Sequence, residues 1–139
     1  MEGFPILLLF MLFSYLYSIS CGYLTGFIKN LKRNFMKIVK VTYSTKPEYA
    51  EQNQLNIKTV MADLQKINNP NINYNCCLGP DGISFTHTAF FNSPEDEKVL
   101  LTLPAFIHFQ TQLKANGLEA PPKQELLNLV GSSKNIFSE

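Results

Sequence analysis

The sequence predicts an α+β fold in which four strands form one antiparallel sheet and two helical segments cover one of its faces. Three observations support this prediction. Gly79, Pro80, Asp81 and Gly82 form a dense turn signal between two runs of strand-forming residues, which is typical of a β-hairpin. A helical pattern precedes the hairpin and another follows it. A short strand pattern stands at each end, so the order is β-α-β-β-α-β, the ferredoxin-like plan.

The first strand is predicted over residues 37–44 (KIVKVTYS), because this segment is short and rich in β-branched side chains. Thr45 and Glu48 have the spacing of a capping box, and Pro47 suits the first turn of a helix. This helix is expected to run to about Ile67, where the sequence NNPN ends it. Its apolar stripe consists of Ile57, Val60, Met61, Leu64 and Ile67.

The hairpin, residues 72–91, places alternate side chains on opposite faces of the sheet. In its first arm Ile72, Tyr74, Cys76 and Leu78 share a face. In its second arm Phe85, His87, Ala89 and Phe91 share one. Alternation does not decide which of these faces meets the helices.

After the hairpin, Ser93 is expected to cap a helical segment over residues 95–115 that Pro104 interrupts, because proline removes a backbone hydrogen bond. A last strand is predicted over residues 124–132 and a tail over residues 134–139. The domain therefore spans residues 36–133. Apolar residues on both faces of the outer strands, such as Ile38 beside Val39, predict that a second copy covers the bare sheet face in a homodimer.

Residues 1–35 form a hydrophobic segment outside this fold, and two interpretations of it are open. Residues 4–28 hold no charge and are long enough to span a bilayer. Lys29, Lys32 and Arg33 would then keep the following domain cytoplasmic, anchored to the inner membrane. Alternatively, translation starts at Met36 and the segment is a mis-called upstream extension. The protein is expected to associate with a membrane only if residues 1–35 are a real membrane anchor.

Charge and cysteine usage exclude some classes of function. The net charge is +1, so the chain has no basic surface typical of nucleic-acid binding. Its three cysteines are odd in number, and Cys76 and Cys77 are adjacent and point to opposite faces. This pattern indicates a reducing compartment rather than a disulfide framework.

Several motifs resemble one known family. VTYSTKPEYAEQN, DGISFTHTAFF, LPAFIHFQ, APP and LVGS, in this order over residues 36–133, resemble the small bacterial members of the antibiotic biosynthesis monooxygenase-like family. The resemblance implies a dimeric α+β barrel. Thr88 stands where such members often have valine, and the chain has no tryptophan, so any family mechanism that relies on one cannot apply.

The family includes cofactor-free quinone-forming monooxygenases, haem-degrading enzymes and proteins of no known activity, so the resemblance leaves open whether this chain is an enzyme. It implies a cofactor-independent monooxygenase-like protein for a small aromatic or quinol-type compound, or a non-catalytic dimeric module of the same fold. Neither cofactor nor metal is expected, because His87 and His108 do not form a metal motif.

Cofactor-free oxygenation needs an apolar pocket and a group that stabilises the substrate anion. His87 is the candidate base, because the unperturbed pKa of a histidine lies near neutrality, and Tyr74 on the paired arm is the candidate hydrogen-bond donor. The alternative is that both are ordinary strand residues. The candidate substrate-binding residues, equally typical of a core, are Phe85, Phe91, Phe106, Phe109 and Asn75.

Overall fold

A computed structural model describes residues 36–137 of the chain. The hydrophobic segment of residues 1–35, with its two interpretations, lies outside the described residues. Within residues 36–137, no helix is both long enough and apolar enough to cross a membrane.

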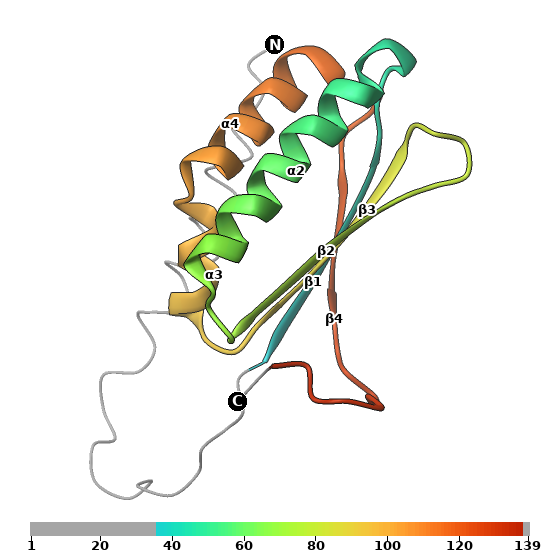
Figure 1. The fold of residues 1–139 in the computed structure, drawn as a ribbon. Helices are drawn as coiled ribbons and strands as arrows, with labels where there is room; N and C mark the ends of the chain where they lie inside the picture. The colour runs from blue at the N-terminus through green and yellow to red at the C-terminus, as the bar shows by residue number, and fades with distance from the viewer. Residues whose placement is uncertain (1–35, 138–139) are drawn as a thin grey trace, which may run out of the picture. The chain divides into compact units, whose positions relative to one another are not determined.

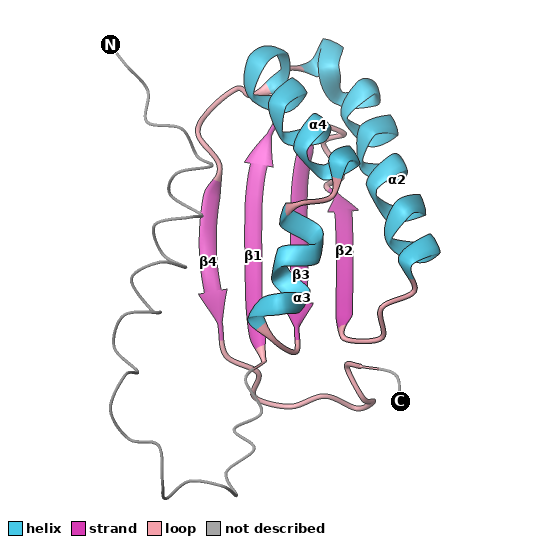
Figure 2. Ribbon diagram, turned by 90° about the vertical axis from the view of Figure 1, so that its left-hand side faces the viewer, coloured by secondary structure: helices cyan, strands magenta, loops and turns pink. Residues whose placement is uncertain are grey.

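Four strands form a single antiparallel sheet with the order β2-β3-β1-β4 (Figure 2). The strands are β1 (Lys37–Ser44), β2 (Ile72–Leu78), β3 (Ser84–Phe91) and β4 (Lys123–Leu127). The hairpin β2–β3 and the pairing of β1 with both β3 and β4 reproduce the predicted ferredoxin-like arrangement. The fold class is therefore confirmed.

The helices lie on one side of this sheet (Figure 1). They are α2 (Ala50–Ile67), α3 (Pro94–Leu101) and α4 (Pro104–Gln112), and α4 continues into a single π turn (Leu113–Gly117). The break between α3 and α4 falls at Pro104 as predicted. Ser93 caps α3 as predicted, because its Oγ accepts a hydrogen bond from the Asp96 amide at 3.2 Å.

The predicted capping box at Thr45 and Glu48 is wrong. A 3-10 turn, Pro47–Tyr49, precedes α2, and neither this turn nor α2 has a side-chain cap. Thr45 is instead fully buried, and its amide and hydroxyl both donate to the Ile83 carbonyl, at 3.0 and 3.4 Å. The hydroxyl thus ties the end of β1 to the start of β3 and is not available to the helix.

The last strand ends earlier than predicted. β4 stops at Leu127, whereas the sequence predicts a strand to Ser132. Leu127 pairs with Ile38, and β1 begins only one residue before Ile38. The residues after Leu127 therefore have no further length of β1 to pair with.

The core lies between the sheet and the helices. Strand β3 alternates between buried and half-buried residues, and its buried side chains, among them Phe85 and His87, face the helices. This answers the question that strand alternation left open. The buried apolar cluster contains Val39, Tyr43, Ile57, Val60, Phe85, Ala89, Phe91, Leu100, Phe106, Phe109 and Leu113.

The opposite sheet face, here called the open face, is more polar than predicted. Between β1 and the edge strand β4 it carries an ion-pair network in which Glu125 contacts Lys123 at 3.0 Å and Lys40 at 3.7 Å. Ile38 at one end is buried, and Leu127 beside it is 40% exposed. Apolar exposure is therefore concentrated at the β4 end of the sheet and in the residues that follow.

Candidate functional site

His87 lies at the centre of the helix-covered side of the sheet. Its side chain is buried, with 4% of the residue exposed. The imidazole stacks between two tyrosine rings, with centroids 5.4 Å from Tyr43 and 5.7 Å from Tyr74. The Phe109 ring lies 5.6 Å away on the helix side. Three strands and α4 thus enclose this histidine.

Both nitrogens of the imidazole have hydrogen-bond partners. The Tyr74 hydroxyl lies 2.6 Å from His87 Nδ1, and the Tyr43 hydroxyl lies 2.9 Å from Nε2. The Cys76 thiol is also within 3.3 Å of Nε2. These contacts follow from the strand register, because His87 pairs with Cys76 on one side and with Val41 on the other. Tyr43 and Tyr74 are each two residues from one of these partners and therefore share the same face.

Asn53 gives this hydrogen-bond chain a direction. Its Nδ2 donates to the Tyr43 hydroxyl at 3.0 Å, so the single proton of that hydroxyl is available for His87 Nε2. A neutral imidazole then carries its proton on Nδ1, and Nδ1–H donates to the Tyr74 oxygen. The Tyr74 hydroxyl proton is therefore free to be donated to another acceptor. Asn53 is fully buried, and its Oδ1 has no partner within residues 36–137.

We expect nuclear magnetic resonance to detect His87 as the Nδ1–H tautomer, because Nε2 is occupied as an acceptor. The measurement is a long-range nitrogen–proton correlation spectrum at neutral pH, in which the two nitrogen shifts identify the tautomer. His108 on α4 is exposed and provides the control in the same spectrum. A proton on Nε2 would contradict this direction of the chain.

Burial keeps every member of this cluster uncharged at neutral pH. It lowers the pKa of His87 to about 4 and raises the pKa of Tyr74 well above its usual value. It raises the pKa of Tyr43 as well, although the hydrogen bond from Asn53 opposes that rise. The pKa of the Cys76 thiol is raised to about 12, so Cys76 and His87 do not form a thiolate–imidazolium pair.

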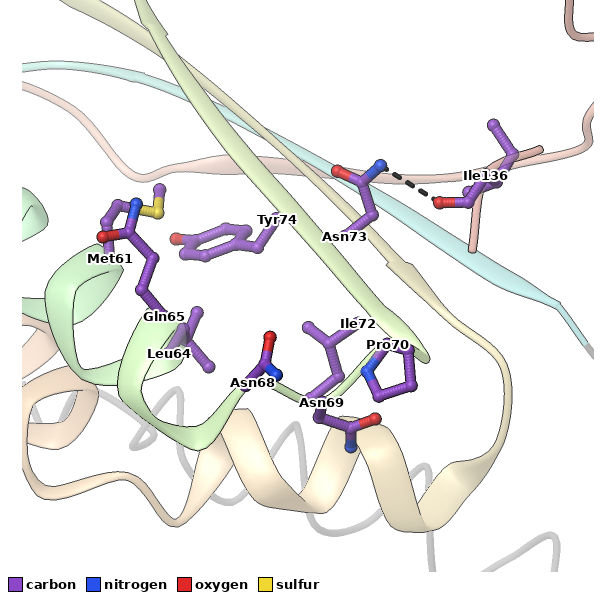
Figure 3. A pocket seen from close by; sticks show the side chains of 10 residues that line it. All are labelled: Met61, Leu64, Gln65, Asn68, Asn69, Pro70, Ile72, Asn73, Tyr74 and Ile136. Atoms are coloured by element: carbon purple, nitrogen blue, oxygen red, sulfur yellow. Dashed lines mark hydrogen bonds between the residues drawn. The ribbon is translucent and has the colours of Figure 1, made fainter. Parts of the chain in front are cut away.

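A pocket of about 330 Å³ opens between α2 and β2, and Tyr74 forms part of its wall. We call it the Tyr74 pocket. Figure 3 shows its lining, in which the Tyr74 ring projects from β2 toward the side chains of α2. The lining residues are Met61, Leu64, Gln65, Asn68, Asn69, Pro70, Ile72, Asn73, Tyr74 and Ile136.

A second pocket of about 210 Å³, the Cys76 pocket, lies farther along the same pair of elements. Met61 lines both pockets. The Cys76 pocket is lined by Gln54, Ile57, Lys58, Met61, Cys76, Leu78 and Phe85. Each pocket is therefore lined by one residue that is hydrogen-bonded to the buried His87: Tyr74 in the first pocket and Cys76 in the second.

The structure brings together some of the predicted site residues and separates others. His87 and Tyr74 are in direct contact, and Phe106 and Phe109 pack on their rings. Phe85 lines the Cys76 pocket, while Phe91 is buried and lines neither pocket. Asn75 is exposed on the open face, where its amide donates to Asn73 at 2.7 Å. An odd position on β2 places Asn75 opposite to Tyr74, so it lies apart from the other candidates.

Tyr43, Asn53 and Cys76 are members of the cluster that the sequence did not single out as site residues. Asn53 had a usable signal, since it lies four residues before Ile57 and so falls on the inner stripe of α2. A polar residue on such a stripe is buried and needs a polar partner. Tyr43 had no comparable signal, because its contact with His87 depends on the register in which β1 pairs with β3.

In residues 36–137, no three side chains of histidine, cysteine, aspartate or glutamate lie close enough together to hold an ion. The polar atoms around His87 belong mainly to phenols and a carboxamide.

Solved structures with the same fold include two named "putative antibiotic biosynthesis monooxygenase". The one from Nitrosomonas europaea is 13% identical, with a TM-score of 0.59, and the match covers 70% of this chain and 93% of that one. The one from Caulobacter crescentus is 18% identical, with a TM-score of 0.58, and covers 69% and 91%. A conserved protein from Methanosarcina mazei is 11% identical, with a TM-score of 0.56, and covers 66% and 90%.

No family model and no curated protein sequence matches the chain. At identities of 11–18% the structural likeness establishes the fold alone. The single-chain fold implied by the sequence resemblance is therefore confirmed: the chain has an α+β, ferredoxin-like fold that it shares with proteins named antibiotic biosynthesis monooxygenase.

Proposed function

We propose that this chain is a cofactor-independent monooxygenase that oxidises a small aromatic or quinol-type compound bound in the Tyr74 pocket. One observation carries the proposal: the Tyr74 hydroxyl connects a pocket of ligand size to a buried, neutral histidine at 2.6 Å. A pocket with apolar walls and a few convergent polar groups is the usual form of a small-molecule site.

The chemistry needs no external reductant. A phenol that gains one oxygen atom from dioxygen becomes a quinone, and the second oxygen atom leaves as water with the hydroxyl and ring hydrogens. The phenol loses its proton to solvent in the open pocket, and the protein needs to stabilise the resulting phenolate, which supplies the electrons. In this proposal the Tyr74 hydroxyl donates a hydrogen bond to the phenolate oxygen. His87 Nδ1–H donates to the Tyr74 oxygen and so makes the Tyr74 hydroxyl a stronger donor. His87 therefore acts through Tyr74 and does not itself touch the substrate.

Oxygen consumption against a panel of phenols and dihydroquinones tests the proposal. We expect Tyr74→Phe to lower kcat at least tenfold with a smaller change in KM, because the lost hydrogen bond forms mainly to the charged state. His87→Ala should also lower kcat, while His108→Ala, at an exposed position of α4, should leave it unchanged. A wild-type chain that consumes no oxygen with any member would overturn the proposal.

A non-catalytic binding module is the second candidate, and a specific observation favours it. The space around His87 is filled by side chains, because Phe85, Phe91, Phe106 and Phe109 are all at least 93% buried. The two pockets are open to solvent and do not enclose a ligand beside the imidazole. Anaerobic calorimetry that detects quinol binding by a chain that consumes no oxygen would support the module.

We infer that two copies associate through the open face at its β4 end. The support is the apolar exposure there, since Leu127, Leu129 and Val130 are each at least 40% exposed. Leu127→Lys should therefore shift the chain from dimer to monomer in size-exclusion chromatography with light scattering. Leu55→Lys, at an exposed site on α2, is the matched control. A wild-type chain that is monomeric at micromolar concentrations would refute the inference.

A further inference from the structure

The polar part of the Tyr74 pocket has an unusual composition. Of the described residues that line it, none carries a charge, and its polar side chains are one phenol and four carboxamides. Figure 3 shows Gln65 and Asn68 on the α2 side of the pocket and Tyr74 on the β2 side. The remaining walls are mostly apolar, with Met61, Leu64 and Ile72 among them.

Two of the four carboxamides are already occupied. Asn69 donates to Asp96 at 2.9 Å and accepts from the Asn71 amide at 2.9 Å. Asn73 donates to the Ile136 carbonyl at 3.3 Å and accepts from the Asn75 side chain at 2.7 Å. These bonds fix the rim of the pocket and leave little capacity for a ligand.

Gln65 and Asn68 are different. Both are exposed residues of the lining, and within residues 36–137 neither side chain makes a hydrogen bond. Gln65 lies in the last turn of α2, and Asn68 is its C-cap with φ of 51°, a left-handed conformation that asparagine tolerates. Their amides are therefore available on the wall that faces Tyr74.

Phenols and carboxamides share a property that charged groups lack, because each can both donate and accept a hydrogen bond. A quinol presents hydroxyl groups, and the quinone made from it presents carbonyl oxygens that accept only. A carboxylate in the wall would bind only the first form and an ammonium would favour the second. The lining of the Tyr74 pocket can satisfy both forms without a change of charge.

We propose that the Tyr74 pocket selects an uncharged aromatic ligand with oxygens on opposite sides of the ring, one bonded to Tyr74 and the other to Gln65 or Asn68, in either oxidation state. This deepens the proposed function and rests on it for the identity of the bound class. The volume of about 330 Å³ is near the lower end for ligand pockets, about 300 to 1,000 Å³, which favours a ligand of one or two rings.

Anaerobic isothermal titration calorimetry tests this selection without relying on turnover. Hydroquinone should bind at least tenfold more tightly than gentisate, which is hydroquinone bearing a carboxylate, because the wall offers that charge no partner. Durohydroquinone and duroquinone should bind within about threefold of each other. Equal binding of hydroquinone and gentisate, or a strong preference for one oxidation state, would overturn the proposal.

Two variants assign the selection to Gln65. Gln65→Leu keeps the size of the side chain and should weaken hydroquinone binding about fivefold through the lost hydrogen bond. Gln65→Lys should instead strengthen gentisate binding at least fivefold over wild type, because it supplies a cation. Gln110→Leu and Gln110→Lys on α4, away from both pockets, are the matched controls and should change neither affinity.

The outcomes separate this inference from the proposed activity. Selective binding of hydroquinone without oxygen consumption would refute the monooxygenase and leave the selection intact. Oxygen consumption with an unchanged preference in both Gln65 variants would refute the selection and leave the activity intact. An absence of binding by every probe would refute the selection.

Discussion

Phe85→Ala should lower the free energy of unfolding by about 3–5 kcal/mol. Phe85 is 98% buried at the start of β3, and its ring stacks on Tyr43 with centroids 5.5 Å apart. Removing the ring loses its transfer free energy and leaves a cavity between the sheet and α2 that the backbone cannot close. Urea denaturation followed by circular dichroism measures the change.

Phe90→Ala is the matched control, because Phe90 lies on the same strand but on the open face and is half-buried. It should lower the free energy of unfolding by less than half as much as Phe85→Ala, because the Phe90 ring buries less apolar surface. Equal losses from the two substitutions would mean that the open face is as well packed as the helix side, contrary to the burial pattern of β3.

The fold was predictable because each element has a strong local signal. In β3, a run of eight strand-forming residues follows a turn signal, and the structure alternates half-buried and buried positions along it, so that one face is the core. Pro104 interrupts the second helical segment, and Ser93 begins it, for reasons that concern the backbone alone. Such signals need no knowledge of distant neighbours, so they can be read along the chain.

The site was only partly predictable, because it depends on register and packing. The sequence placed His87 and Tyr74 on paired arms, and their contact follows from the hairpin. It did not place Tyr43 beside them, because that needs the register of β1 against β3, in which Val41 pairs with His87. Thr45 shows the same limit: its spacing favours a helix cap, but the approach of Ile83 takes its hydroxyl instead.

The resemblance to monooxygenases implied a base at His87, and burial changes what that base can do. An imidazole whose pKa is about 4 is a weak base at neutral pH, but it stays neutral and keeps one donor and one acceptor nitrogen for hydrogen bonds. In the proposed function, its contact with Tyr74 therefore orients the phenol and does not remove a substrate proton. This is why the proposed function places the donor role on Tyr74.

The same burial should make the protein sensitive to acid. The pKa of His87 falls from 6.5 in the unfolded chain to about 4 in the folded one, so the unfolded state binds the proton more readily between these values. Stability is therefore unaffected above about pH 6.5 and decreases as the pH falls toward 4. The expected loss is about 3 kcal/mol, from about 1.4 kcal/mol for each pH unit.

His87→Leu isolates this effect, because leucine does not titrate and the other acid-sensitive groups remain. The groups in contact with His87 are Tyr43, Tyr74 and Cys76, and all three have raised pKa values, so they stay neutral over this pH range. Urea denaturation of both chains at intervals from pH 7 to pH 4 gives the two stability curves. The wild-type curve should fall by about 3 kcal/mol relative to that of His87→Leu. Parallel curves would mean that His87 is protonated in the folded state near its ordinary pKa, and that the neutral hydrogen-bond chain to Tyr74 does not hold at acidic pH.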